Sequence, residues 1–521
     1  MRKINTRTLL SLLVTLAATA ASAQAGRATR GDCTPTITDQ AARTVTQRQP
    51  PMRHLRAPNN NWNPATTYRQ MVILVSYADR DFASPEPNQY YHRIFNEPGY
   101  NEGAGPGCVA DYFREQSAGL FNIQFDIYGP YKTTAKAQPH QNPTAGTRNY
   151  GSDVMRQATT QLIEQNPTLD CTPYDWDGDG RVDQVIYIYA GLSGNQGEET
   201  YGYVWPNTST FTPLTTPSGH TISDYSCSAE QWTEGQSSGI GTICHEFCHC
   251  LGLPDIYPTG GSSGYYSVAD EWDLMDGGNF TNHGWCPPNF TPLEKILMGW
   301  LTPTELNQPA TVKNLTATSE GGETYLIHHT DNEYLLLENR QQTGWDAGVP
   351  GKGLLVYHVD YDATIWARNT VNNTKNHFRF DILHADRLDY EQWDIICPRT
   401  DNQYAAQPMM NNLHLSTSPY PWATDSTDTV NRALTDDTNP AATMYNPNAE
   451  GKYLLGKPVT NITMTPDGKV SFDFMGGDPT AAQPVSPQPR PAATFHSLTG
   501  QRLAAPTKGL VISNGKKYIT H

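Results

Sequence analysis

The sequence has no long run of basic side chains. Its 521 residues carry 36 Lys and Arg against 52 Asp and Glu, so the formal net charge is −16. Affinity for nucleic acid comes largely from Lys and Arg side chains that neutralise phosphates. A polyanion of this kind is a poor nucleic-acid binder, and we expect no nucleic-acid partner.

Long apolar runs are also missing. The N-terminal segment LLSLLVTLA is shorter than the ~20 apolar residues that span a bilayer. It follows the charged stretch MRKINTR and precedes the small residues AASA, which is typical of a secretory signal peptide and disfavours a membrane anchor. We predict a signal peptide over residues 1–23, whose removal takes away three positive charges and leaves −19. We expect a product without a transmembrane segment that crosses the periplasm and is secreted or held at the cell surface.

Cysteine is sparse, with nine in the chain. An odd number in an exported protein leaves at least one Cys free or paired outside the chain, and so few disulfides do not dictate the fold. With 37% apolar residues, 42 Gly and 39 Pro, the chain is typical of a loop-rich globular protein. Its length is enough for two or three domains.

The pattern changes along the chain. Residues 24–66 are polar and are predicted to be a propeptide or a lead-in. From 67 to 300, predicted strands alternate with amphipathic helices, which indicates an α+β catalytic domain. The predicted helices cover 107–117, 152–166 and the segment around 245, and the predicted strands include 72–75, 184–191 and one that starts at 122 and ends at Gly129-Pro130.

Short alternating runs follow. The segments TYLIHH, EYLLLENR, GLLVYHVDY, RFDIL and KVSFDF predict a β-rich, sandwich-like domain over 301–475. A Pro/Ala linker over 476–493 and a short tail over 494–521 complete the chain.

The stretch CHEFCHCLGLPDIY, residues 244–257, contains the pattern His-Glu-x-x-His. Residues four apart lie on one face of a helix, so His245 and His249 can present two imidazoles to one metal ion. Glu246 is then placed to act as general base on a water at that ion. The alternative is an ordinary helix that happens to carry two histidines.

Gly252 and Pro254 favour the metal site. Gly252 ends the helix by adopting a positive φ, and Pro254 prevents the helix from resuming. The turn brings Asp255 back as a third ligand, and catalytic zinc takes three protein ligands. Glu271, on a later segment, is the rival third ligand; we prefer Asp255, because the Gly turn serves no purpose in the other arrangement.

Three cysteines, Cys244, Cys248 and Cys250, surround the histidines. A structural zinc site is the alternative, but no second CxxC element is present to complete four ligands. Cys248 also points away from the predicted histidine face. We expect these cysteines to be buried small hydrophobes or disulfide partners.

The loop DWDGDGRVD is a second candidate metal site, for structural calcium. Asp175, Asp177 and Asp179 occupy positions 1, 3 and 5 of an EF-hand-like loop, and Asp183 occupies position 9. Position 12 is Ile186 rather than glutamate, so the pattern is incomplete, and Glu198 or Glu199 is a candidate source of the missing ligand. The alternative is an acidic surface turn.

Several segments together resemble a known family, the M6 peptidases, which are secreted zinc proteases of the immune inhibitor A type. These segments are VILVSYADRDF, GCVADYFREQSAGLFNIQFDIYGPY, DWDGDGRVDQVIYIYAG, the GEE at 197–199, HEFCHCLGLPDIY, WDLMDGG and ENRQQTGWDAGVPGKGLLVYHVDY, and they extend over roughly residues 67–475. The resemblance implies a metzincin-like catalytic domain, a zinc-dependent metalloendopeptidase activity on protein or peptide substrates, and a latent precursor or zymogen.

The resemblance also assigns Met275, in WDLMDGG, to a methionine turn beneath the metal; a plain core methionine is the alternative. Many metzincins have a tyrosine two residues after this Met, whereas this chain has Gly277. Tyr257 is a weak candidate for the group that stabilises the oxyanion.

The two ends carry further hypotheses. Cys33, Asp32 or Asp39 could block the metal in the precursor. The tail resembles a C-terminal module of proteins exported by some Gram-negative anaerobes, so it is either a signal for export or surface-attachment machinery or a small β-hairpin without a role. Two rival functions stay open: a catalytically silent adhesin or binding module, which the intact Glu246 argues against, and a zinc hydrolase that acts on other substrates.

Overall fold

The computed structural model describes residues 62–138, 149–195, 202–260, 267–374, 376–389, 415–423 and 430–477, and the backbone of four short strands between 495 and 520. The predicted signal peptide and nearly all of the predicted lead-in lie outside these residues. No described helix is long and apolar enough to cross a membrane.

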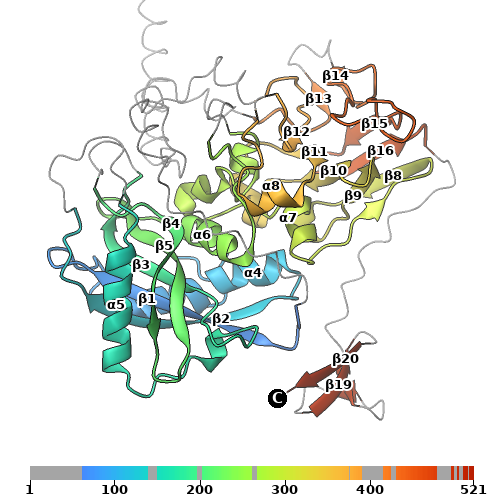
Figure 1. Ribbon diagram of the computed structural model, residues 1–521. Coiled ribbons are helices and arrows are strands. Elements are labelled where there is room, and N and C mark those ends of the chain that lie inside the picture. Colours follow the sequence, from blue (N-terminus) through green and yellow to red (C-terminus); the bar gives the residue numbers. More distant parts are fainter. Residues whose placement is uncertain are drawn as a thin grey trace, which may run out of the picture.

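The N-terminal half is built on a six-stranded mixed sheet (Figure 1). The sheet has the order β2-β1-β3-β5-β4, with β6 paired to β5. Strands β1, β2, β3 and β5 run parallel, and β4 is an antiparallel edge strand. The strands are β1 Thr67–Ser76, β2 Asn122–Lys132, β3 Val185–Leu192, β4 Asn207–Thr215, β5 Thr221–Thr233 and β6 Gln236–Ser237.

Helices cover both faces of this sheet. Side chains alternate along a strand, so Val72 and Leu74 of β1 face one core while Met71 and Ile73 face another. Helix α5 packs on the second core, and α3, α4 and α6 pack on the first, on the opposite side of the sheet (Figure 1). The helices are α3 Pro87–Asn96, α4 Val109–Gln116, α5 Ser152–Gln165, α6 Gly241–Leu251, α7 Pro292–Leu297 and α8 Ala363–Ala367, with 3-10 turns at Thr172–Tyr174, Asp270–Trp272, Gly278–Gly284, Thr318–Glu320 and Gly344–Gly348.

The region after residue 300 is β-rich. A five-stranded sheet of order β12-β11-β10-β9-β7 shares a core with a three-stranded sheet of order β15-β16-β8. The strands are β7 Thr304–Glu305, β8 Ala310–Leu315, β9 Tyr325–His328, β10 Glu333–Arg340, β11 Gly353–Asp360, β12 Phe380–Ile382, β13 Trp422–Ala423, β14 Val430–Asn431, β15 Val459–Met464 and β16 Val470–Phe474.

The two halves share one core. On β10, Leu335 and Leu337 face the core between the two sheets, while Leu336 belongs to the cluster that contains Cys244 and Cys248 of α6. The five-stranded sheet therefore has the three-stranded sheet on one face and the core that includes α6 on the other, with α7 in contact with β10.

The predicted mixture of helices and sheets is confirmed, and the predicted strands and helices occur close to their expected bounds. One boundary was wrong. β2 does not end at Gly129-Pro130 but continues to Lys132, because a register shift opposite Ile73 and Val75 lets Tyr131 and Lys132 rejoin β1. The metzincin-like and sandwich-like descriptions and the domain boundaries stay predictions.

The two ends of the described chain differ in how they are held. Trp62, inside the predicted lead-in, donates its indole N–H to the carbonyl of Met298 at 2.7 Å, and its ring lies 4.4 Å from Phe121 and 6.2 Å from Trp300. At the other end, β17 Phe495–Ser497, β18 Arg502–Leu503, β19 Gly509–Ser513 and β20 Lys516–Thr520 form a separate four-stranded sheet. The predicted role of this tail in export stays a prediction.

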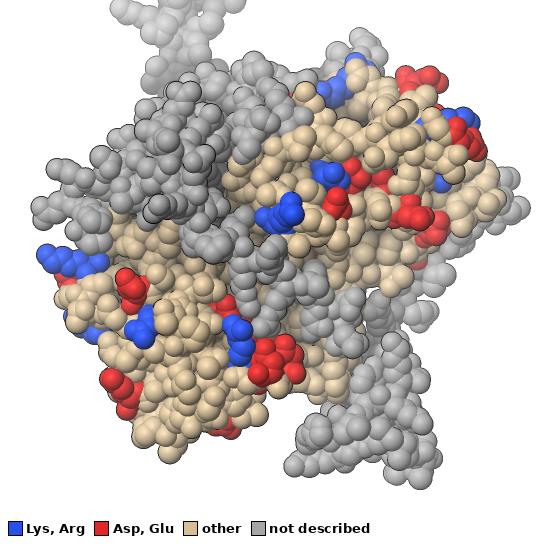
Figure 2. All heavy atoms as spheres, in the orientation of Figure 1, with Lys and Arg blue, Asp and Glu red and all other residues tan. Residues whose placement is uncertain are grey.

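Charged side chains of both signs are scattered over the drawn surface. On the face drawn in Figure 2, Lys and Arg are scattered among Asp and Glu, and the described residues form no continuous basic patch there.

Candidate metal centre

Helix α6 carries the two histidines of the predicted site. It begins at Gly241 and ends at Leu251, and Gly252 follows with φ of 104°. The Leu253 N–H donates to the carbonyl of Cys248 at 3.0 Å, which closes the helix end. The chain then turns back toward the helix, and this reversal brings Asp255 to the histidines, as the sequence predicts.

The three predicted ligand groups converge on one point. The Oδ1 of Asp255 lies 3.2 Å from the Nε2 of His245 and 3.2 Å from the Nε2 of His249. All three side chains are buried. Among the described residues, their ligand atoms form a group within 4.8 Å of one another that does not include Glu271.

Each imidazole is oriented by a backbone carbonyl. The Nδ1 of His245 lies 2.8 Å from the carbonyl oxygen of Leu274, and the Nδ1 of His249 lies 2.8 Å from that of Leu253. A carbonyl only accepts, so each Nδ1 carries the proton and each Nε2 of a neutral ring presents a lone pair. Three electron-pair donors therefore face one another in a buried space.

This arrangement fits a bound cation. The Nε2 of His245 and the Oδ1 of Asp255 are buried and make no hydrogen bond of good geometry. Zinc with nitrogen and oxygen ligands at ~2.0–2.1 Å in a tetrahedron holds those ligand atoms about 3.3 Å apart, close to the observed separations. The donor set and its spacing both suit a divalent metal.

The electrostatics of the site point the same way. Burial alone would lower the pKa of His249, but the Asp255 carboxylate outweighs burial and raises that pKa to about 9. Burial would likewise raise the pKa of Asp255, but His249 and His245 outweigh it and hold that pKa well below its ordinary value. The buried Asp255 carboxylate is therefore stable only with a positive charge beside it, which is either a proton on an imidazole or a metal ion.

Glu246 lies next to this group and is buried. The Thr208 hydroxyl, on the edge strand β4, is 3.1 Å from the Oε2 of Glu246 and 2.9 Å from its backbone carbonyl oxygen. Burial raises the pKa of Glu246, and the neighbouring His245 and His249 oppose that rise. The sequence did not point to Thr208, because it lies 38 positions away in a strand without apolar alternation.

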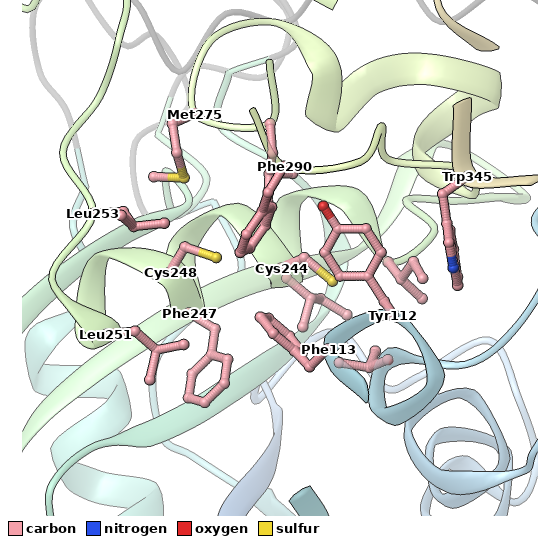
Figure 3. Packing of buried hydrophobic residues seen from close by; sticks show 14 of the residues in the cluster. Tyr112, Phe113, Cys244, Phe247, Cys248, Leu251, Leu253, Met275, Phe290 and Trp345 are labelled. Carbon is pink, nitrogen blue, oxygen red and sulfur yellow. The ribbon is translucent and has the colours of Figure 1, made fainter. Parts of the chain in front are cut away.

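The cysteines of α6 face the core. Cys244 and Cys248 pack with Tyr112, Phe113 and Phe290, as Figure 3 shows. Burial raises the pKa of both thiols well above the ordinary value, in keeping with their place in the apolar core. This confirms the prediction that they act as buried small hydrophobes; Cys250 is partly buried beside the same cluster.

The segment around Met275 contacts both the histidine helix, through the carbonyl of Leu274, and the chain just after Asp255. Met275 is fully buried, and its carbonyl accepts the N–H of Ile256 at 2.9 Å, directly after Asp255. A Cβ built on Gly277 would lie 2.3 Å from the Oδ1 of Asp270, so a tyrosine does not fit there in this conformation. The ring of Tyr257 is nearly parallel to that of His245, with centroids 6.5 Å apart. Its role in stabilising an oxyanion stays a prediction.

The acidic loop gathers part of the second predicted set. Carboxylate oxygens of Asp175, Asp177 and Asp183 lie within 4.8 Å of one another, whereas Asp179 is outside this group and accepts the Arg181 N–H. Glu198 and Glu199, and the predicted latency residues Cys33, Asp32 and Asp39, lie outside the described residues.

Known proteins resemble part of this chain. Residues 77–297 match the family model described as immune inhibitor A peptidase M6, catalytic domain. Immune inhibitor A of Bacillus thuringiensis subsp. alesti is 24% identical in an alignment of 269 residues that covers 43% of this chain and 38% of that protein. The pre-pro-metalloprotease PrtV of Vibrio cholerae serotype O1 is 22% identical in an alignment of 226 residues that covers 37% of this chain and 24% of that protein.

The alignments therefore span less than two fifths of the length of either relative. The family match over residues 77–297 contains His245, Glu246, His249 and Asp255. The family match and the curated relatives identify residues 77–297 as a peptidase domain of the M6 metallopeptidase family.

Proposed function

We propose that this protein is a secreted, zinc-dependent endopeptidase that hydrolyses protein substrates. His245, His249 and Asp255 hold the zinc ion, and Glu246 is the general base. One observation carries the proposal: a single carboxylate oxygen lies 3.2 Å from both imidazole nitrogens, and each imidazole is fixed by a carbonyl on its other nitrogen.

A zinc ion bound here supplies Lewis-acid activation of water and of the substrate carbonyl. Glu246 takes the proton from the attacking water and delivers it to the leaving amine. Thr208 holds one oxygen of that carboxylate, which orients the base. Burial raises the pKa of Glu246, and a base of raised pKa binds the transferred proton more firmly.

Secretion, latency and a metzincin-like fold complete the proposal. The N-terminal signal pattern supports export. The Vibrio relative is named a pre-pro-metalloprotease, which supports a precursor with a removable leader. We also propose that Asp175, Asp177 and Asp183 hold a structural calcium ion, with Asp179 shaping the loop.

Casein or gelatin zymography tests the function, with the chain assayed before and after proteolytic trimming of the lead-in upstream of Trp62. We expect cleavage that a chelator abolishes and added zinc restores. The Glu246→Ala variant should keep its zinc and lose cleavage, since the base is not a ligand.

The same assay separates the rival functions. A binding module predicts no cleavage by the trimmed wild type. A hydrolase of other substrates predicts bound zinc without proteolysis. Either result contradicts the proposal.

A further inference from the structure

The third ligand of the candidate centre is held by a residue from the far half of the chain. The side-chain amide of Asn369 donates from Nδ2 to the Oδ2 of Asp255 at 2.6 Å. Its Oδ1 accepts the backbone N–H of the same aspartate at 2.5 Å. Asn369 and Asp255 are both buried and are 114 positions apart in the sequence.

This double contact fixes the orientation of both groups. The backbone N–H of Asp255 can only donate and its carboxylate can only accept, so the amide of Asn369 has one possible orientation. With Oδ2 occupied by the amide, Oδ1 is the oxygen left to face His245 and His249, as observed. The amide therefore selects which carboxylate oxygen is available to a cation.

The backbone at Asn369 explains why asparagine suits this position. Asn369 follows helix α8 in the left-handed region, with φ of 55°. Its N–H donates to the carbonyl of Trp366 at 3.0 Å. Asn and Gly are the residues that commonly end helices in this conformation. Of the two, only Asn has a side-chain amide that can donate a hydrogen bond to Asp255.

Neighbouring asparagines hold the segment that follows Asp255. Asn372 donates to the carbonyl of Ile256 at 2.8 Å, and Asn373 accepts the Gly260 N–H at 3.1 Å. The Thr259 hydroxyl donates to the backbone carbonyl of Asn369 at 2.6 Å. We call residues 369–373 the asparagine loop. Asn369 and Asn372 hold positions 255 and 256, whereas the side chain of Asn373 bonds to Thr259 and Gly260, several residues after the ligand.

We propose that Asn369 is a positioning residue for the metal centre, and that it holds Asp255 with Oδ1 directed at both imidazoles. The β-rich half thereby contributes to the site. This inference rests on the proposed function, because it assigns a role toward the zinc ion that His245, His249 and Asp255 hold. Hydrogen bonds to ligating carboxylates typically contribute about 10–100-fold to metal affinity.

The test compares zinc affinity in full-length variants, measured by competition with a chromophoric chelator. Asn369→Gly keeps a residue that tolerates positive φ and removes the amide. We expect its zinc affinity to fall by about 10–100-fold. Asn373→Ala is the matched control, because it lies in the same loop but does not contact Asp255. Its affinity should stay within about twofold of wild type, well below the effect of losing a bond to a ligand.

Two further measurements separate positioning from general stability. With cobalt(II) in place of zinc, the visible absorption of Asn369→Gly should differ from wild type, and that of Asn373→Ala should not. Melting of the metal-free proteins reports any loss of fold, and Asn369→Ser repeats the test should the Gly variant not fold. Equal zinc affinity and equal cobalt spectra in wild type and Asn369→Gly would overturn the inference. Absence of zinc from the wild type would instead overturn the proposed function.

Discussion

The two candidate cation sites, the α6 centre and the acidic loop, differ in how their carboxylates are surrounded. At the α6 centre, Asp255 is buried, and the two imidazoles beside it present lone pairs. In the acidic loop, by contrast, the carboxylate of Asp175 accepts the N–H groups of Gly178, Asp179 and Gly180 from the loop itself. Asp177 is exposed and accepts the N–H of Asp179.

The difference shows what makes a group of acidic residues dependent on a metal. A buried lone pair without a donor costs free energy until a proton or a cation occupies it. Loop carboxylates that already accept backbone N–H groups have much less need of one, and this includes the buried Asp183, which accepts the N–H of Trp176. We therefore expect the α6 centre to depend strongly on its ion and the acidic loop to depend on its ion weakly.

The largest expected effect is at His249. His249→Ala removes one of three ligands, and the two that remain do not make a stable site for catalytic zinc. Zinc, measured by mass spectrometry, should fall from about one ion per chain to background. Glu271→Gln is the control, since Glu271 is outside the ligand group, and a loss of zinc from that variant would contradict the ligand assignment.

A smaller effect is expected when the base is changed and the ligands are kept. Glu246→Gln preserves shape and removes proton transfer, so kcat/KM on a peptide substrate should fall by roughly 10²–10⁴-fold. The zinc content should not change, because Glu246 is not a ligand. Activity within a few-fold of wild type would rule out Glu246 as the base.

Glu333 is a third kind of carboxylate and sharpens the comparison. It is buried on β10, and it accepts from His358 at 2.7 Å and from the N–H groups of Tyr445 and Asn446. Burial alone would raise its pKa, but these donors outweigh burial and lower the pKa of Glu333 to about 2. Protein donors alone satisfy this carboxylate.

Its contribution to stability follows from the sign of that shift. The folded pKa is below the unfolded value of about 4.3, so the stabilisation is present above that pH and is lost as the pH falls toward 2. Glu333→Gln should lower the melting temperature by about 5 °C at pH 7. The difference from wild type should shrink below pH ~4, and zinc content should not change. A difference that is constant with pH would contradict the role of the ionised form.

The smallest effect is expected in the acidic loop. Saturating calcium should raise the melting temperature of the wild type by only about 3 °C. Asp177→Ala should abolish that rise and leave the calcium-free melting temperature and the zinc content unchanged, because Asp177 makes one short-range bond to the loop. A calcium response that persists in Asp177→Ala would show that the ion does not bind between these aspartates.

The part of the candidate centre that lies close together in the sequence could be predicted. Residues four apart on a helix share a face, and a Gly with a Pro two residues later forces a turn, so the meeting of His245, His249 and Asp255 could be predicted from eleven consecutive positions. The strand over 72–75 was also predictable, because a continuous apolar run is typical of a strand buried on both faces.

The non-local part could not be predicted. No periodicity links Asn369 to Asp255, since their contact depends on how the β-rich half packs against α6. Strand β4, which supplies Thr208, reads NTSTFTPLT; its threonines and proline carry no alternation of apolar and polar residues. The apolar run around Leu336 predicted a strand, but it did not identify α7 as the helix that packs against this strand.

The aromatic contacts of Trp62 set a limit on where the chain can be trimmed. Its indole covers Phe121 and Trp300 and is tied to the backbone just before Trp300. A processing enzyme that cuts upstream of residue 62 leaves the indole of Trp62 packed on these two rings. A cut a few residues later would uncover two large rings to water, so N-terminal sequencing of the mature protein should find Trp62 retained.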